Sequence, residues 1–196
     1  GQISSEASTA ITLAANLDSD ADDSTTPLAS MSLDGATEEI STIAGEADFS
    51  TSVAIYDSLG TKHDLTLCFE KNSTNNWTCY VIADGGDVVD QSTGSTMTEG
   101  MGFGIAQIDL TYDTDGSLLT FTQTDTYTTS PWNWEGAEDV ASYIFNFGLD
   151  AANEENGGSL SQLSSDSTVT SLDQDGYSVG HLTSMQVQTD GTILGR

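Results

Sequence analysis

Val53-Ala54-Ile55-Tyr56-Asp57-Ser58-Leu59-Gly60-Thr61-Lys62-His63-Asp64-Leu65-Thr66-Leu67-Cys68-Phe69, followed by the segment from Asn72 to Ile82, is the stretch that decides the fold. Its apolar residues alternate with polar ones, which predicts three antiparallel strands joined by turns at 57–60 and 72–76. The large apolar side chains all occupy odd-numbered positions. A register that sets Phe69 opposite Trp77 would therefore place them on one buried face.

The same register makes a prediction about the two cysteines of the chain. Cys68 would lie opposite Thr78, and Cys79 would lie opposite Leu67. Their sulfur atoms would then point to opposite faces of the sheet, where they cannot bond to each other. We predict two reduced thiols, with Cys79 as a small residue of the core.

Alternation predicts further strands on both sides of this stretch. They span residues 8–17 (Ile11, Leu13, Ala15), 105–112, 117–122 (Leu119, Phe121), 143–149 (Tyr143, Phe145, Phe147, Leu149), 185–187 and 193–194. Asp113-Thr114-Asp115-Gly116 and Thr189-Asp190-Gly191-Thr192 are predicted hairpin turns in which glycine supplies a positive φ. Residues 83–104 and 153–167 are predicted exposed loops, while residues 28–43 fit either a loop or a short helical turn.

The predicted fold is all-β, with short antiparallel strands and long polar loops in a barrel-like or sandwich domain.

The chain is strongly acidic. It has 31 acidic residues and only three basic ones, Lys62, Lys71 and Arg196, for a formal net charge of −28. Nucleic acids and anionic lipids are excluded as partners, because binding phosphate requires cationic side chains. Copies should repel each other, so a monomer is expected. No apolar run reaches membrane-spanning length.

Two features suggest an extracellular calcium-stabilised adhesin or carbohydrate-binding module as an alternative. The segment Asn16–Asp23 spaces carboxylates at alternate positions, as calcium loops do. Counted from Asp18, however, the sixth residue is Asp23 where an EF-hand has glycine, and the twelfth is Ala29 where it has glutamate. Trp132 and Trp134 could stack on a sugar, although paired aromatic residues more often fill a core or a packed corner.

The sequence offers no pattern for catalysis. His63 and His181 are the only histidines, and neither has a neighbouring nucleophile or metal-ligand spacing. His63 stands beside the predicted turn at 57–60, where a solvated side chain is expected. We therefore predict no catalytic, cofactor-binding or metal-binding residue, and no enzyme activity.

Two segments resemble the bacterial flagellar hook protein family. Residues 53–65, with the aromatic strand ending in Trp77, resemble the opening of the family's outer domain, and residues 173–184 and 189–196 resemble its return passage. The resemblance implies an outer domain at 10–172, a first connection at 1–9 and a return connection at 173–196, which lie close together. It also implies an internal fragment without terminal helices.

The resemblance further implies what such a subunit does and where it works. Hook proteins are exported through the flagellar channel and build a curved extracellular tube, a universal joint between motor and filament, so the partners would be other copies of the subunit. Another axial protein of the flagellum, such as a rod or cap component, remains an alternative.

Overall fold

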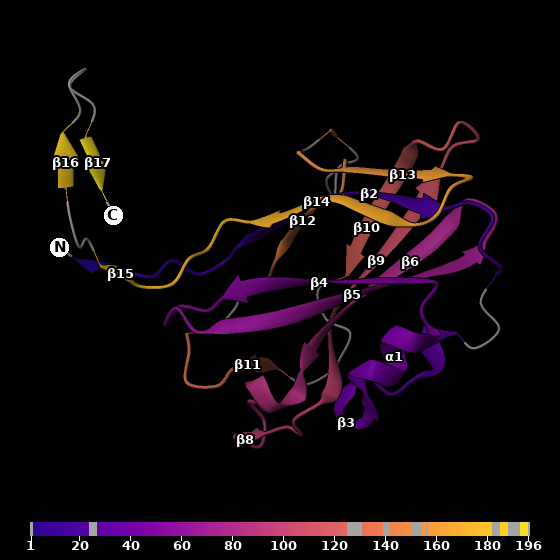
Figure 1. The fold of residues 1–196 in the computed structure, drawn as a ribbon. Helices are drawn as coiled ribbons and strands as arrows, with labels where there is room; N and C mark the ends of the chain where they lie inside the picture. The colour runs from indigo at the N-terminus through magenta and orange to yellow at the C-terminus, as the bar shows by residue number, and fades with distance from the viewer. Residues whose placement is uncertain are drawn as a thin grey trace.

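The computed structural model describes residues 2–23, 27–124, 131–138, 142–149, 154–155, 157–181, 185–187 and 193–195. Two β-sheets form the body of the molecule (Figure 1). The main sheet has the order β10-β9-β6-β5-β4, with strands at Leu118–Thr124, Met101–Tyr112, Asn76–Asp84, Lys62–Ser73 and Phe49–Tyr56. β3 (Asp34–Glu39) also pairs with β9. The four-stranded sheet is built on β2 (Ala10–Asp18).

The hydrophobic core lies between these two sheets, which makes the fold a sandwich. β2 contributes Ile11, Leu13, Ala15 and Leu17, and the main sheet contributes the odd-numbered residues of the central stretch. The predicted interior residues are all buried: Leu65, Leu67, Phe69, Trp77, Cys79 and Val81. The all-β prediction and the single buried face of the three central strands are confirmed.

The predicted register of β5 and β6 is wrong by two residues. Phe69 lies opposite Cys79, and Trp77 lies opposite Lys71. The strands extend further than the sequence indicates, because the turn between them is a tight one at Thr74 and Asn75, with Asn75 at φ 61°. An even shift leaves every side chain on its predicted face, so the composition of the core is unaffected.

Both cysteines are buried and free, and they lie on opposite faces of the main sheet as predicted. Cys79 belongs to the core between the sheets. Cys68 belongs to a second apolar cluster on the other face, beneath the 3₁₀ helix η1 (Leu28–Ser30) and the helix α1 (Ile40–Glu46). Burial raises the pKa of the Cys68 thiol to about 12, so it stays protonated at neutral pH.

Two strands of the four-stranded sheet are parallel to β2, which the antiparallel prediction missed. β12 (Ile144–Asn146) and β13 (Ser159–Leu163) pair in parallel with β2 along one edge, and β14 (Thr168–Gln174) pairs antiparallel along the other. β13 also corrects the predicted loop at 153–167. Parallel pairing is possible because more than a hundred residues connect β2 to these strands, so no hairpin constrains them.

Residues 83–104 are not the exposed loop that the sequence predicts. β6 and β9 extend into this segment, and Val88 and Phe103 are buried. Between them η2 (Gly85–Asp87) is followed by β7 (Val88–Asp90) and β8 (Ser95–Thr96), and β7 pairs with β11 (Trp132–Trp134).

The hairpin of β9 and β10 turns at Asp113–Gly116 as predicted, with Gly116 at φ +85°. The register of β10 against β9 then shifts between Leu118 and Thr120, so Leu119 does not point into the core. Leu119 is consequently 53% exposed, whereas Phe121 reaches the core. The prediction that both leucine and phenylalanine would be buried on one face is therefore wrong for Leu119.

The chain ends form smaller paired elements. β1 (Gln2–Ile3) pairs antiparallel with β15 (Gly180–His181), away from the two sheets (Figure 1). β16 (Met185–Val187) pairs antiparallel with β17 (Ile193–Gly195), as predicted, although the turn Thr189–Thr192 lies outside the described residues. Within the part that is described, no helix has the length and apolar character to cross a membrane.

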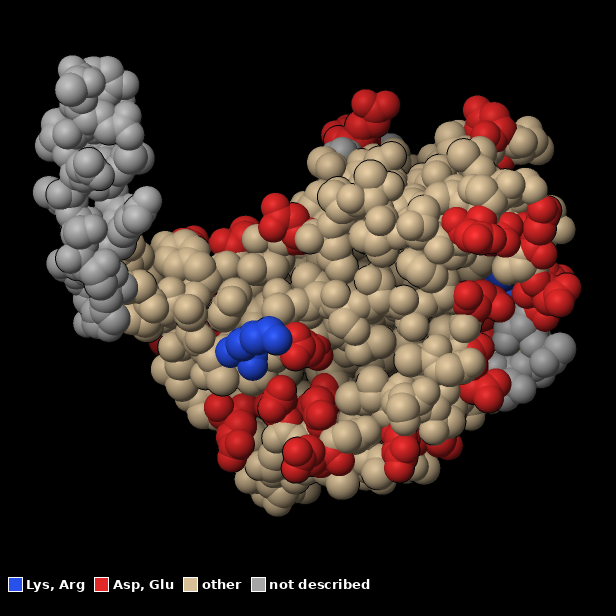
Figure 2. All heavy atoms as spheres, viewed as in Figure 1, with Lys and Arg blue, Asp and Glu red and all other residues tan. Residues whose placement is uncertain are grey.

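The second face of the four-stranded sheet is turned to solvent, and we call it the open face. It comprises the even-numbered residues of β2 and the residues registered opposite them: Ala10, Thr12, Ala14, Asn16 and Asp18 in β2, Ile144 and Asn146 in β12, Ser159, Ser161 and Leu163 in β13, and Thr168, Ser171 and Asp173 in β14. Each is half-buried or exposed. In Figure 2 the upper part of the body, where β2, β13 and β14 lie in Figure 1, is mostly tan at its centre, with red carboxylates around it.

Candidate functional site

Both ends of the sandwich chain leave through one two-stranded segment, residues 2–9 and 175–181, which we call the neck. β1 and β15 pair at its far end, and Glu6 and Tyr177 exchange two backbone hydrogen bonds of 2.9 Å in its middle. The incoming and outgoing chains are thus joined before they reach the sheets. A domain attached in this way moves as one unit on two adjacent strands.

Ser8 connects the neck to the edge of the main sheet. Its backbone N–H donates to the carbonyl of Tyr56, and its Oγ accepts from the Tyr56 N–H. The same hydroxyl donates to Oε1 of Gln174, which also accepts from the Gly176 N–H. A Cβ at Gly176 would lie 2.4 Å from Ser8 Oγ, so only glycine fits there.

Asp175 closes the base of the neck from the other side. Its carboxylate accepts hydrogen bonds from the N–H of Thr9 at 2.7 Å, the Thr9 hydroxyl at 2.6 Å and the N–H of Ala10 at 3.0 Å. Partial burial raises the pKa of Asp175, but the bonds from Ala10 and Thr9 outweigh it and hold the pKa below its usual value. The ionised carboxylate is therefore the form that holds the neck closed.

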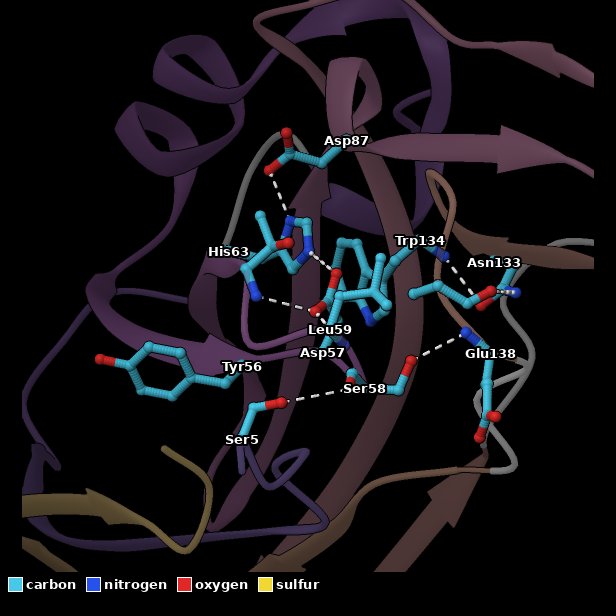
Figure 3. A network of polar contacts seen from close by, with 12 residues as sticks. Ser5, Tyr56, Asp57, Ser58, Leu59, His63, Asp87, Asn133, Trp134 and Glu138 are labelled. Carbon is cyan, nitrogen blue, oxygen red and sulfur yellow. Dashed lines mark hydrogen bonds and ion pairs between the residues drawn. The ribbon is translucent and has the colours of Figure 1, made fainter. Parts of the chain in front are cut away.

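The turn at 57–60 packs against the neck. The hydroxyl of Ser5 donates to the carbonyl of Ser58, and a Cβ at Gly60 would lie 2.7 Å from the Cβ of Ser5. Gly60 has φ +81°, which together with this close approach explains why glycine ends the turn. The Ser58 hydroxyl accepts from the N–H of Glu138, which ties the turn to the segment after β11 (Figure 3).

His63 supports this turn from inside and is 5% exposed, so the prediction of a solvated side chain is wrong. Its Nε2 lies 3.1 Å from Asp57 Oδ2, and its Nδ1 lies 3.0 Å from Asp87 Oδ2 (Figure 3). The ring stacks on Trp134 with centroids 4.1 Å apart. His63 therefore bridges the turn, the short helix η2 and β11.

Asp57 organises the turn at the centre of this network. Oδ1 accepts from the N–H groups of Leu59 and Thr61, while Oδ2 faces His63. Burial raises the pKa of Asp57, but the hydrogen bonds from His63, Thr61 and Leu59 more than offset it, so the pKa lies below its usual value. Asp57 is 3% exposed and is stabilised as a carboxylate.

This arrangement of histidine and carboxylates is suited to holding structure and unsuited to catalysis. A general base needs a free ring nitrogen within reach of a substrate. Both ring nitrogens of His63 face carboxylates, and one ring face is covered by Trp134. The other histidine, His181, lies in β15, which pairs with β1 at the far end of the neck.

The paired tryptophans form a packed corner and no sugar platform. Trp134 is 1% exposed, with its indole N–H donating to the Tyr143 hydroxyl at 2.8 Å. Trp132 meets Trp134 edge to face at an interplanar angle of 84° and lies against the edge of Phe103. Stacking on a sugar requires exposed indole faces directed to one side, and this geometry does not provide them.

The acidic loop after β2 already holds a cation of the protein itself. Nζ of Lys71 donates to the carbonyl oxygens of Ser19 at 3.0 Å and Ala21 at 2.6 Å, and lies 3.8 Å from Asp23 Oδ1. Calcium would need these converging oxygens as its own ligands. Across the described ranges, no group of three or more His, Cys, Asp or Glu side chains is placed to hold a metal.

Sequence reasoning missed Asp57, His63 and Asp87 as a network. The alternation of the central stretch could have indicated that two of them are buried. Positions 57 and 63 are odd-numbered, as are the buried residues Ile55 and Leu65 on the same face. Residue chemistry argued for solvent and overrode that signal. Asp87 is the last residue of η2, a short helix that the sequence did not predict, and nothing in the sequence indicated that its side chain would approach His63.

Fold and site together define a β-sandwich domain that is carried on a two-stranded neck, as a domain inserted into a longer chain would be. Residues 16–177 match the family described as the flagellar basal body protein FlaE D2 domain. Since the match covers most of the sequence, the chain belongs to this family.

Flagellar hook proteins FlgE are among its relatives. The protein from Treponema pallidum is 27% identical over 198 residues, covering 90% of this chain and 42% of that protein. The Escherichia coli protein is 29% identical over 144 residues, covering 74% and 30%. The chain thus spans less than half the length of these relatives.

Two solved structures are also similar. One is the 32 kDa fragment of FlgE from Caulobacter crescentus, with a TM-score of 0.40 and 18% identity over 66% of this chain and 46% of that one. The other is FlgE2 from Helicobacter pylori, with a TM-score of 0.37 and 17% identity over 75% and 31%.

Proposed function

We propose that this chain is the outer domain of a bacterial flagellar hook subunit, a structural part of the curved tube that acts as a universal joint between motor and filament. Family membership supports the proposal, and the neck is the observation that carries it. A surface domain of a polymer must be attached to the inner wall of the tube at one place, and both strands of this chain leave the sandwich together.

In this role the domain boundaries follow the neck. Residues 10–172 form the outer domain, and residues 1–9 and 173–196 connect it to an inner domain that builds the tube wall. The return connection begins inside β14, whose last residue is Gln174. Asp175 then bonds to Thr9 and Ala10, so the two connections join where the sandwich begins.

The bonds at the base of the neck make the domain a stiff lever. Ser8 holds the neck to β4, Asp175 holds its two strands together, and the turn at 57–60 packs against Ser5. A displacement of the connections is then passed to the sandwich as a rigid-body movement. Adjacent subunits can slide past each other as the tube bends, while each sandwich keeps its own shape.

The remaining properties follow from the same role. The subunit is exported through the flagellar channel and works outside the cell, with other copies of the subunit as its partners. The isolated chain is a monomer at low ionic strength, because every copy carries a net charge of −28 and copies repel each other there. We expect no enzymatic activity and no requirement for a metal or cofactor, and the two ring nitrogens of His63, which both lie against carboxylates, are consistent with this structural role.

Immunogold electron microscopy tests this function directly. Antibodies raised against this chain should label flagella of the source organism on the short curved segment between the cell surface and the filament. Labelling confined to the filament tip or the rod would assign the chain to another axial protein. Labelling of the cell surface away from flagella would overturn the flagellar function altogether.

A further inference from the structure

The open face differs in charge from the rest of this acidic domain. Only Asp18 and Asp173, at opposite ends of the face, carry charge. Between them the exposed side chains are small and uncharged, and two large apolar residues stand among them, Ile144 at 58% and Leu163 at 50% exposure. In a chain with 31 acidic residues, a whole sheet face without carboxylates at its centre needs a physical reason.

Electrostatics restricts what can cover such a face. A cationic partner would gain more from the carboxylates elsewhere on the surface, so an uncharged face offers it no advantage. An acidic partner can approach only where carboxylates are absent, because like charges within about one Debye length, roughly 8 Å at physiological salt, repel each other. The face therefore suits a second acidic surface.

The polar groups of the face also permit close contact at little cost. Asn16 Oδ1 accepts from the Ser161 hydroxyl and the Leu163 N–H, while Asn16 Nδ2 donates to the Ser165 carbonyl. Asn146 Nδ2 donates to the Thr12 hydroxyl at 3.3 Å. Because these groups bond to one another within the sheet or to the loop after β13, covering them removes fewer hydrogen bonds to water than covering unpaired groups would.

We propose that the open face is the surface through which this domain contacts a second copy of the chain. This inference rests on the proposed function, which places many copies side by side, and it names the surface that they use. The contact is weak and reversible, since small side chains with two exposed apolar residues bury little apolar area. The charged margins of the two copies repel unless the uncharged faces are aligned.

Dilution of the ¹⁵N-labelled chain, followed by amide chemical shifts, tests the surface residue by residue. The salt should be about 0.5 M NaCl, where the Debye length falls to about 4 Å and repulsion is screened. Concentrations from about 0.05 to about 1 mM cover a contact with a Kd near 1 mM. Shifts should change with concentration at amides of β2, β13 and β14 and remain constant on α1 and β11.

Two matched variants separate this face from a general charge effect. Ser171→Glu adds one negative charge on the open face, whereas Ser52→Glu adds the same charge at an exposed serine of β4. Ser171→Glu should weaken self-association at least tenfold, and Ser52→Glu should change it less than twofold. Spectra at the lowest concentration must match the parent outside the substituted site, which verifies that both variants are folded.

These experiments distinguish failure of the open-face contact from failure of the proposed function. Shifts that map to another surface, no shift up to 1 mM, or equal effects of the two variants would overturn the open face as the contact. Gold labelling of the hook combined with any of these results would leave the proposed function standing. Shifts on the open face with labelling elsewhere would support the contact and refute the hook.

Discussion

Replacing Asp175 with alanine should open the neck while leaving the sandwich folded. The carboxylate of Asp175 bonds to Thr9 and Ala10, which precede it by more than 160 residues. None of its three bonds is a backbone bond between strands, although Ala10 is the first residue of β2. Their loss should therefore release the connection from the sandwich and should not disturb the core.

The size of the effect follows from these three bonds. A net contribution of about 0.5 kcal/mol each, the lower end for protein hydrogen bonds, is appropriate for a solvent-exposed carboxylate. The sum of about 1.5 kcal/mol corresponds to roughly a tenfold change in the opening equilibrium. Amides that exchange through opening of the neck should lose protection by that factor.

Hydrogen exchange monitored by NMR measures this opening at single residues. In Asp175→Ala, protection at the amides of Thr9, Ala10 and Tyr177 should fall about tenfold, and protection at Leu67 should be unchanged. Asp90→Ala is the matched control. Asp90 also has a lowered pKa, but its carboxylate bonds only to Ser92 and Thr93, two and three residues further along the chain, so this change should leave the neck intact.

Acid should reproduce the effect in the unmodified chain. The folded-state pKa of Asp175 is lowered, so its contribution is fully present above the unfolded value of about 3.9 and is lost as the pH falls through the folded-state pKa. Neck protection should thus decline below about pH 4 in the parent chain and show no such decline in Asp175→Ala. Unchanged protection at Thr9, or an equal loss at Leu67, would refute the role of Asp175.

Three further predictions concern the parts that hold the neck and the loops. His63→Ala should lower the free energy of unfolding by about 2–4 kcal/mol in urea titrations, because a buried carboxylate loses its partner, whereas Lys62→Ala at the adjacent exposed ion pair should cost less than about 0.5 kcal/mol. Gly176→Ala should destabilise the neck, since its Cβ would overlap Ser8, while Gly45→Ala in α1 meets open space and should raise the melting temperature through helix propensity. The melting temperature should be the same with calcium as with chelator, because Lys71 occupies the converging oxygens of the acidic loop. A rise of about 2.7 kcal/mol in the free energy of unfolding, at a calcium concentration a hundred times Kd, would instead show a calcium site.

The alternation of the central stretch was sufficient to predict the core face of the main sheet. Period-two patterns fix which side chains share a face even when the register is off by an even number, as it was for Phe69 and Trp77. The same parity extends to the polar residues His63 and Lys71, which are both buried on the odd-numbered face. For these residues the odd-numbered position predicted burial correctly, whereas the polarity of the side chain did not.

The parts that could not be predicted depend on contacts between distant segments. The strand β13, with Leu160 and Gln162 buried, is specified by its parallel pairing with β2 and by the bond from Trp77 to Gln162. A five-residue segment rich in serine carries no local signal of that kind. The exposure of Leu119 likewise results from a bulge that only the partner strand β9 defines.

The distribution of charge connects the stable interior with the proposed contact between copies. Both cations in the described part of the chain are already engaged, Lys62 with Asp64 and Lys71 with the loop after β2. Lys71 is held within its own chain, and the exposed Lys62 already faces a carboxylate, so these two lysines contribute little attraction between copies that each carry a net charge of −28. The proposed contact therefore relies on uncharged surface, and repulsion at its margins limits how far the two faces can shift before they separate. The proposed role in a bending joint would need that combination, because contacts that are weak and confined to one orientation can break and reform while the neck keeps each sandwich in place.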